Sequence, residues 1–250
     1  MKEQERQRAI RHKMARFEAA PVAAPAAALG TGFPSLDAAL GGGLPRGRII
    51  EIFGPPCGKT TLMLQIAVHA QESGAGAAWI DADHSFDPAY ASALGADLGR
   101  MAVVRPESAE QAIEMGQRLA ESGAIELLVL DSAAALVPQL ELDAGVGDQS
   151  PGLQSRVLAW GLRRLAGVVL RSGTVVAFLN QTRTRKGPDG ADIETSAAGP
   201  PLKMHAAVRV ELGPGADGRV RFRVLKNRAA AAFATGDLVR APGAGFVKSP

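Results

Sequence analysis

EIFGPPCGKTT, residues 51–61, is the stretch that decides the fold. It begins as an apolar strand, turns at glycine and proline, and enters a helix-forming segment. Gly54, Gly58, Lys59 and Thr60 therefore look like a phosphate-binding loop, in which backbone N–H groups at a helix start point at a phosphate. Lys59 would reach the β- and γ-phosphates and the Thr60 hydroxyl would bind Mg²⁺. The stretch predicts ATP and Mg²⁺ as cofactors.

The loop departs from the usual pattern G-x-x-x-x-G-K-[ST]. Three residues instead of four separate its glycines, and Pro55 and Pro56 have no N–H to donate. The donors from Gly58 to Thr61 remain. A plain turn before a helix is the alternative, which Gly-Lys-Thr-Thr at a strand-to-helix junction disfavours. Cys57 is either a small loop residue, the reading we favour, or a redox switch.

Short apolar segments alternate with helical ones on both sides of this loop, which predicts an α/β fold with a mostly parallel central sheet. Ser108 and Gln111 have capping-box spacing, which supports a helix start there. A hairpin is expected at the sheet edge, from Ala206–Leu212 and Arg219–Leu225, and long loops are expected at Glu141–Pro151 and Thr182–Pro200. The other expected strands and helices are Arg48–Phe53, Ala77–Asp81, Met101–Val104, Leu127–Asp131, Thr174–Asn180, Thr60–Gln71, Ser108–Ser122 and Gly152–Arg171.

The N-terminal 30 residues differ from the rest. Residues 2–16 hold six basic and two acidic side chains, a net charge of +4, in a chain whose total is +3. We expect an amphipathic helix over residues 3–18 with Ile10, Met14 and Phe17 on one face, then an Ala/Pro-rich linker. Residues 31–250 are expected to form one ATPase core. The N-terminus has no signal-peptide pattern, no apolar run is long enough to span a membrane, and the single cysteine fits a reducing compartment. These features predict a cytoplasmic protein.

A second charge asymmetry lies between Gln149 and Pro188, where seven basic residues occur without an acidic one. Such a patch is typical of a surface for a polyanion, although a solvated basic face is an equally good explanation of the patch alone. Its members are Arg156, Arg163, Arg164, Arg171, Arg183, Arg185 and Lys186.

Carboxylates follow two of the expected strands. LLVLDS, residues 127–132, ends an apolar strand in Asp131, which resembles a Walker B element that holds Mg²⁺ directly or through water. DADHSFDPAY, residues 81–90, offers Asp83 to polarise an attacking water, or merely to cap a loop. His84 and His205 have no partners at metal-ligand spacing and are expected to be structural, and Trp160 is expected to pack within a helix.

The order of the motifs resembles the ATPase core of the bacterial RecA recombinase family, from about Gly32 to Phe233. The series that carries this resemblance is PSLDAALG, GLPRGRIIEIFGPP, DADHSFDPAYA, LLVLDSAAAL, FLNQTR and LKNRAAAAF. No single motif is as specific as the ordered set.

The resemblance implies roles around ATP. The position of Asp83 is a water-activating glutamate in the family, and Gln181 matches a glutamine that senses the γ-phosphate. Asp87 and Tyr90 match positions near the adenine. Lys226 and Arg228 match two lysines that reach the nucleotide of the neighbouring subunit. The implied set is: catalytic, Lys59, Asp83 and Gln181; ATP-binding, Gly54, Cys57, Gly58, Lys59, Thr60, Thr61, Asp87, Tyr90, Lys226 and Arg228; metal, Thr60 and Asp131.

It also implies that single-stranded DNA binds at the two long loops, and that subunits form homo-oligomers or filaments through the N-terminal helix. Pro151 stands where a methionine wedges between bases. Ala198-Gly199 replaces a Gly-Gly pair, and Pro200 has no amide to give. These departures predict weakened DNA binding, and the family's small C-terminal domain is expected to be missing. The implied DNA-binding residues are Gly152, Arg156, Arg163, Arg183, Arg185, Lys186 and Gly199.

Two functions follow. One is an ATP-dependent, single-stranded-DNA-binding protein of recombination and repair with weak DNA-dependent ATPase activity. The other is a degenerate paralogue that serves as an accessory factor in the DNA-damage response, in translesion synthesis, with little hydrolysis. A third reading, a RadA- or KaiC-type ATPase, is disfavoured because the sequence lacks a zinc-finger cysteine set and a second ATPase repeat.

Overall fold

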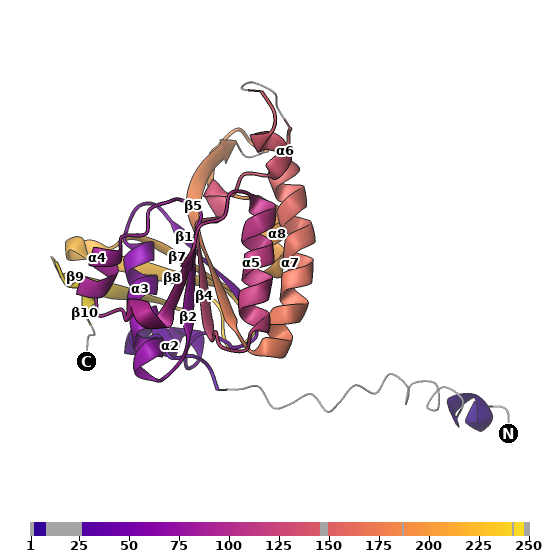
Figure 1. Cartoon of the computed structure of the whole chain (residues 1–250), viewed down its shortest axis with the longest axis horizontal. Coiled ribbons are helices and arrows are strands. Elements are labelled where there is room, and N and C mark those ends of the chain that lie inside the picture. The colour runs from indigo at the N-terminus through magenta and orange to yellow at the C-terminus, as the bar shows by residue number, and fades with distance from the viewer. Residues whose placement is uncertain (1–2, 9–26, 146–149, 187, 242, 248–250) are drawn as a thin grey trace.

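The computed structural model describes residues 3–8, 27–145, 150–186, 188–241 and 243–247 (Figure 1). Residues 3–8 form an exposed helical turn, while the apolar side chains of the expected helix 3–18 lie outside the described residues. The helices are α2 (Pro34–Leu40), α3 (Lys59–Glu72), α4 (Pro88–Ala93), α5 (Ala109–Glu121), α6 (Gln139–Leu142), α7 (Leu153–Ser172) and α8 (Pro200–His205). The strands are β1 (Ile49–Gly54), β2 (Ala77–Asp81), β3 (Met101–Val104), β4 (Leu127–Asp131), β5 (Val175–Lys186), β6 (Asp192–Ser196), β7 (Val208–Pro214), β8 (Val220–Asn227), β9 (Thr235–Ala241) and β10 (Gly245–Val247).

One sheet runs through the described part of the chain in the order β10-β9-β8-β7-β1-β5-β4-β2-β3. From β7 to β3 every pairing is parallel, and β8, β9 and β10 add antiparallel strands. The α/β fold with a mostly parallel sheet is therefore confirmed. The parallel strands β1, β2 and β4 end at the same side of the sheet, level with Gln181 in the longer strand β5, which brings the residues that follow them together beside Gln181.

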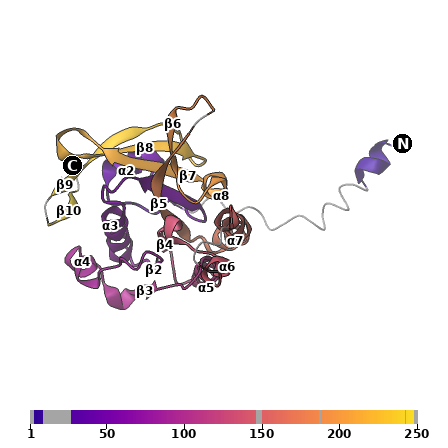
Figure 2. The same cartoon turned by 90° about the horizontal axis from the view of Figure 1, so that it is seen from above.

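Helices cover both faces of the sheet, with α3 on one side and α5 and α7 on the other (Figure 2). In β1 the alternation of side chains divides the core: Ile50 and Ile52 pack in the cluster that contains the α3 residues, and Ile49 packs with those of α5 and α7. Glu51 has the same parity as Ile49, so its carboxylate faces the α7 side. Within the described residues no helix is long and apolar enough to cross a membrane.

Three expectations about the outline of the sheet and surface are wrong. Thr182–Pro200 is not a loop, because β5 continues to Lys186 and pairs antiparallel with β6. The hairpin of β7 and β8 is not at the sheet edge, because β9 and β10 extend the sheet beyond it. Trp160 lies on α7 as expected, but its side chain is 50% exposed and is not packed inside.

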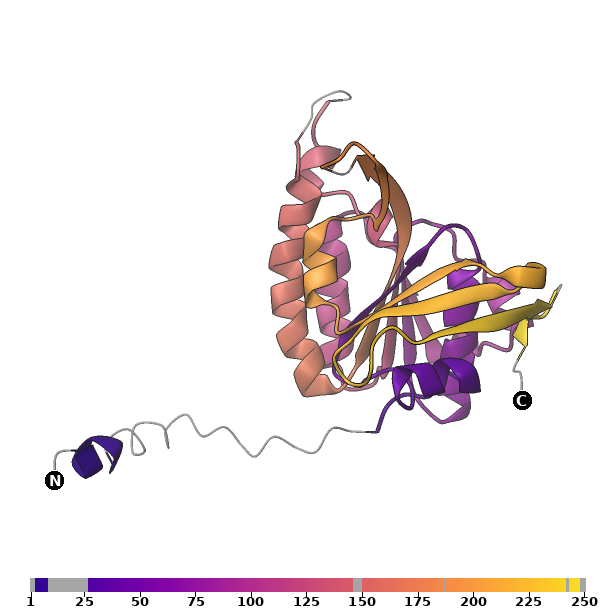
Figure 3. The same cartoon turned by 180° about the vertical axis from the view of Figure 1, so that it is seen from behind.

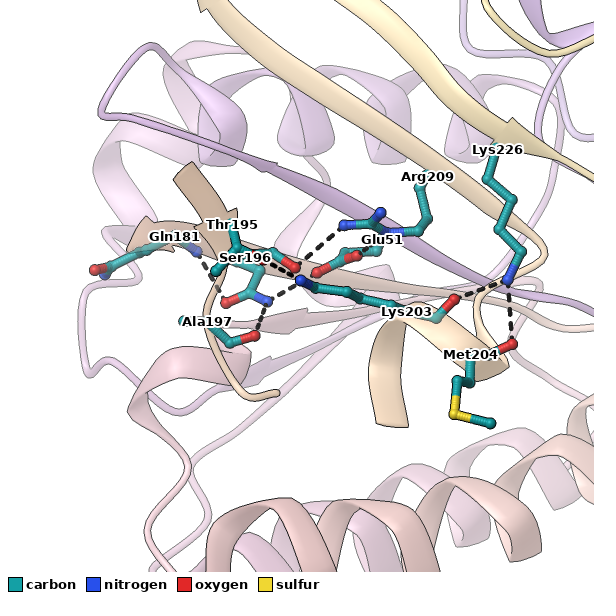
Figure 4. A network of polar contacts seen from close by, with 10 residues as sticks. Glu51, Gln181, Thr195, Ser196, Ala197, Lys203, Met204, Arg209 and Lys226 are labelled. Carbon is teal, nitrogen blue, oxygen red and sulfur yellow. Dashed lines mark hydrogen bonds and ion pairs between the residues drawn. The ribbon is translucent and has the colours of Figure 1, made fainter. Parts of the chain in front are cut away.

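A buried polar network ties β1 to the neighbouring strands (Figure 4). Glu51 is fully buried; one carboxylate oxygen accepts the Asn180 amide at 2.9 Å and the other accepts Arg209 Nε at 2.5 Å. Arg209 also donates to Ser196 Oγ at 3.2 Å and lies over the Phe53 ring. Because a buried carboxylate must be paired, this network fixes β5 and β7 on either side of β1 and holds the end of β6 to them.

We predict that Glu51→Ala lowers the free energy of unfolding by about 3–5 kcal/mol, because it leaves the nearly buried guanidinium of Arg209 without an anion. Chemical denaturation measures the loss. Glu211→Ala is the control, because its partner Arg223 is 54% exposed and that pair should contribute less than about 1 kcal/mol. Equal losses in the two variants would contradict the prediction.

Candidate nucleotide and nucleic-acid sites

A cavity of about 320 Å³ opens at the carboxyl ends of the parallel strands. It collects residues from four separate segments: the loop after β1, the loop after β2, the end of β4 and the middle of β5. The structure thus brings together seven of the residues singled out in the sequence: Gly54, Gly58, Lys59, Thr60, Asp83, Asp131 and Gln181. Such a cavity is large enough to hold the phosphates of a nucleotide.

The shortened phosphate loop still contacts the ammonium group of Lys59. Lys59 Nζ donates to the carbonyl oxygens of Gly54 and Pro55, both at 2.8 Å, which leaves the third N–H of the ammonium for another acceptor. Burial lowers the pKa of Lys59, and the carboxylates of Asp131 and Asp83 oppose that shift. Gly54 is required here because a Cβ would meet the Leu212 carbonyl oxygen at 2.0 Å.

Thr60 and Asp131 both line the cavity and contact each other. Thr60 Oγ1 donates to Asp131 Oδ2 at 2.9 Å, although the two residues are 71 positions apart in the chain. Burial raises the pKa of Asp131 to about 6, the Thr60 hydrogen bond lowers it, and the neighbouring Asp83 and Asp81 raise it further. A buried carboxylate beside two others is an electrostatic cost that a cation would remove.

The donor set fits Mg²⁺. Among the described residues, no group of three or more His, Cys, Asp and Glu could hold a metal by itself. Mg²⁺ is commonly held by one or two protein oxygens together with phosphate oxygens and water, so a hydroxyl and a carboxylate 2.9 Å apart suit it. Thr60 and Asp131 are the residues that would hold the ion.

Asp83 is held in place by the strand that carries Asp131. Its amide donates to the Asp131 carbonyl oxygen at 3.0 Å, and Ser132 Oγ donates to its carboxylate at 3.0 Å. Asp81, at the end of β2, is buried and accepts Ser85 N at 2.9 Å and Arg105 Nε at 3.0 Å, which orders the loop around Asp83. Ser132, Asp81 and Arg105 were missed in the sequence, although Asp81 and Ser132 sit at strand ends and could have been noticed there.

Tyr90 and Asp87 do not line the cavity. Tyr90 OH lies 2.9 Å from Thr61 Oγ1 on α3, and Asp87 caps α4 by accepting the amides of Ala89 and Tyr90. Cys57 is half-buried against the core, and burial raises the pKa of its thiol. A raised thiol pKa disfavours the reactive thiolate, so the redox-switch reading of Cys57 gains no support.

Lys226 and Arg228 lie away from this cavity. Lys226 Nζ donates to the Lys203 and Met204 carbonyl oxygens at 2.8 and 3.1 Å, so it is held at the carboxyl end of α8 (Figure 4). Arg228 borders a second cavity of about 480 Å³ with Arg48 and His205. Burial lowers the pKa of His205, and the cations of Arg163, Lys226 and Arg228 lower it further, so this region is strongly positive.

Several of the DNA-binding candidates lie at the hairpin of β5 and β6, which rises beside the start of α7 (Figure 3). Gly152, Arg183 and Gly199 border a cavity of about 590 Å³ there, together with Glu141. Arg156 and Arg163 are exposed on α7. Lys186 forms an ion pair with Asp192 across the hairpin at 2.7 Å, and the side chain of Arg185 lies outside the described residues. Part of the first expected loop, residues 146–149, also lies outside them.

The backbone just after the hairpin adopts positive φ at two successive residues. Ala198 adopts φ 59° and Gly199 φ 76°, and only the second residue has the freedom of glycine. Pro200 begins α8 and has no amide. The Ala197 amide is already used, because it donates to the Gln181 carbonyl oxygen at 2.8 Å. This corner therefore has few free backbone donors for a phosphate.

The chain is similar in sequence to known proteins over most of its length. The model of the RecA N-terminal domain matches residues 14–245. The chain is 44% identical over 214 residues to "Protein RecA" of Salinispora tropica, an alignment that covers 81% of this chain and 62% of the relative. It is 45% identical over 217 residues to that of Chlorobium chlorochromatii, covering 82% and 62%. For that of Acidothermus cellulolyticus the identity is 41% over 251 residues, covering 92% and 73%. The chain thus spans about three fifths of the length of the first two relatives.

The raised pKa of Asp131 predicts a dependence of stability on pH. Between its ordinary value of 3.8 and about 6, the folded state binds more protons than the unfolded chain, so stability falls as the pH rises through this window. Asp131→Asn should remove the cost and raise the free energy of unfolding at pH 8 by about 3 kcal/mol, but leave it unchanged at low pH.

Denaturation at the two pH values measures this difference, with the exposed Asp217→Asn as the control. A stability gain from Asp131→Asn that is the same at both pH values would show that the carboxylate charge is not its cause.

Proposed function

The chain belongs to the RecA family, and from that premise we propose that it binds ATP with Mg²⁺ and single-stranded DNA in recombination and repair, with weak DNA-dependent ATPase activity. The observation that carries the nucleotide site is the junction of Thr60, Asp131 and Lys59 in one cavity that Gln181 also borders. Residues 31–250 would form the ATPase core. Homo-oligomers or filaments would bring Lys226 and Arg228 to the nucleotide of a neighbouring subunit.

Different residues of the cavity would contact the phosphates, hold the metal ion and activate the attacking water. The amides from Gly58 to Thr61 and the free N–H of Lys59 would bind the phosphate oxygens. Mg²⁺, when bound, would neutralise the charge that develops on the phosphates. Asp83 would accept a proton from the attacking water, and Gln181 would contact the γ-phosphate. Because the Ala197 amide donates to the Gln181 carbonyl, a shift of Gln181 would reach the base of the hairpin.

The weak hydrolysis is proposed from Asp83. An aspartate is one carbon shorter than a glutamate, so its carboxylate lies about 1.5 Å further back, and a displacement of about 1 Å can cost ~10²-fold in rate. The contacts with Ser132 and with the Asp131 carbonyl restrain Asp83 from moving forward. The shortened loop could offset this only by carrying the nucleotide toward Asp83.

A second function, an accessory factor that binds nucleotide with little hydrolysis, is favoured by the DNA side of the molecule. The positive φ of Ala198, the missing amide of Pro200 and the ion pair of Lys186 all reduce the groups free to contact a phosphate backbone. Turnover of ATP with and without single-stranded DNA separates the two functions.

Nucleotide binding should depend on Lys59. We expect ATP–Mg²⁺ to raise the melting temperature of the wild-type protein and not that of Lys59→Ala, because the variant lacks the cation that faces the phosphates. Circular dichroism without nucleotide controls for folding. Equal stabilisation of both proteins by ATP–Mg²⁺ would remove the phosphate-loop assignment.

Asp83→Glu should raise DNA-stimulated turnover by about tenfold or more, because it restores the reach of the carboxylate. Asp83→Asn is the matched control; it keeps the length of aspartate but cannot take a proton, and should abolish turnover. If turnover falls in Asp83→Glu, the nucleotide already sits close to Asp83. A wild-type protein without turnover that Asp83→Glu does not rescue would favour the accessory function.

Single-stranded DNA binding should weaken when Arg156 and Arg163 are both changed to Glu, and its dependence on salt should become shallower. Fluorescence anisotropy of a labelled oligonucleotide at several salt concentrations measures both. Arg118→Glu on α5 is the control, since Arg118 pairs with Glu114 and lies outside the basic stretch. An unchanged affinity at low salt would place the DNA site elsewhere.

A further inference from the structure

The chain has two tryptophans in very different surroundings. Trp79 is 1% exposed on β2 and packs against Phe86, whereas Trp160 on α7 is 50% exposed. A large aromatic side chain left half in water is the less common arrangement, because burying it is favourable. The exposed apolar surface of Trp160 is therefore suited to contact with a binding partner.

Arginines surround Trp160 on its own helix. Arg156, Arg163 and Arg164 lie four residues before, three after and four after it, so helical periodicity places all four side chains on one face. The guanidinium of Arg164 lies 4.6 Å from the centre of the indole ring. None of these arginines forms an ion pair with an acidic side chain in the described ranges, and the surrounding sequence has no acid between Gln149 and Pro188.

The combination of exposed arginines and an exposed ring, on a helix that carries no acidic residue, matches the chemistry of single-stranded nucleic acid. Phosphates are drawn to the arginines, and every base offers a flat face that can stack on an aromatic ring. Arg156 and Arg163 are about 10 Å apart along the helix axis, with Trp160 between them. The guanidinium can remain on one face of the indole while a base stacks on the exposed part.

We propose that Trp160 is a base-stacking platform on α7, which extends the single-stranded-DNA site beyond the hairpin and the start of the helix. This inference rests on the proposed DNA-binding function. It gives the protein an aromatic contact on α7, in a position that depends on neither the hairpin strain at Ala198 nor the absent amide of Pro200. A single strand held there is positioned by phosphate contacts and stacking, so its recognition is tolerant of sequence.

The tryptophans themselves supply the measurement. Titration of the wild-type protein with an oligo-dT strand should quench the emission of Trp160. Trp160→Phe retains a ring and should keep most of the affinity, while the remaining, buried Trp79 should give no quenching. Trp160→Ala should bind the strand about tenfold more weakly by anisotropy. Leu170→Ala, which removes another exposed apolar side chain from α7, is the matched control and should bind as the wild type does.

An abasic strand of the same length separates stacking from charge. It should bind wild type and Trp160→Ala equally, because it offers phosphates without bases. If Trp160→Ala weakens both strands equally, or if dT binds without quenching and with unchanged affinity in the variant, the stacking inference is wrong while the proposed function stands. If the wild type binds no strand at all, both are wrong. Loss of self-association in Trp160→Ala without DNA, seen by sedimentation, would make this surface a subunit contact and overturn the inference.

Discussion

The Glu51 carboxylate lies out of contact with water, three residues before the first glycine of the phosphate loop. Its two oxygens must be satisfied at once, by the Asn180 amide on one neighbouring strand and the Arg209 guanidinium on the other. An unpaired charge at that depth would cost several kcal/mol, so the three strands have little freedom to slip or separate. This constraint fixes the relative positions of the phosphate loop, Gln181 and the base of the β5–β6 hairpin.

The position of the nucleotide cavity follows from that alignment. β1, β4 and β5 pair in parallel, with Glu51 opposite Phe178 and Leu130 opposite the same residue on the other side. The segments after β1 and β4 therefore leave the sheet at one level, beside Gln181 in the middle of β5, and Thr60, Asp131 and Gln181 meet there. Gln181 follows Asn180 directly in the chain. The residue before it therefore belongs to the buried network, and the residues after it pair with β6 in the hairpin. The strand β5 therefore carries both Gln181, which borders the cavity, and one arm of the β5–β6 hairpin.

Much of this could be predicted because it depends on local sequence. Strand ends, the helix after Gly58 and the Ser108 cap depend on a few neighbouring residues, and apart from β5 the structure places them within a residue or two of the expected bounds. The strand expected to end at Asn180 instead continues to Lys186. The β5–β6 hairpin was missed because β6, with the sequence DIETS, is mostly exposed and has no alternation of apolar and polar residues. The Glu51 network joins residues 129 and 158 positions apart, and no local pattern reports such pairs. Trp160 was misjudged because residue type alone suggests burial, whereas its helical position among arginines decides its exposure.

The carboxylates that line the nucleotide cavity also lower the stability of the fold. Asp81 is paired with Arg105, and Asp83 is restrained by Ser132, whereas for Asp131 the hydroxyl of Thr60 and the charge of Lys59 do not outweigh the effect of burial on its pKa. Replacing Asp131 by a neutral residue would relieve the repulsion and would also remove the oxygen that suits a divalent cation. The stability of the fold and the fit of the site to a cation therefore oppose each other at this residue. A carboxylate kept at such a cost is best explained by a cation that offsets it, and the phosphate loop beside it supplies the anion that would bring that cation into the cavity.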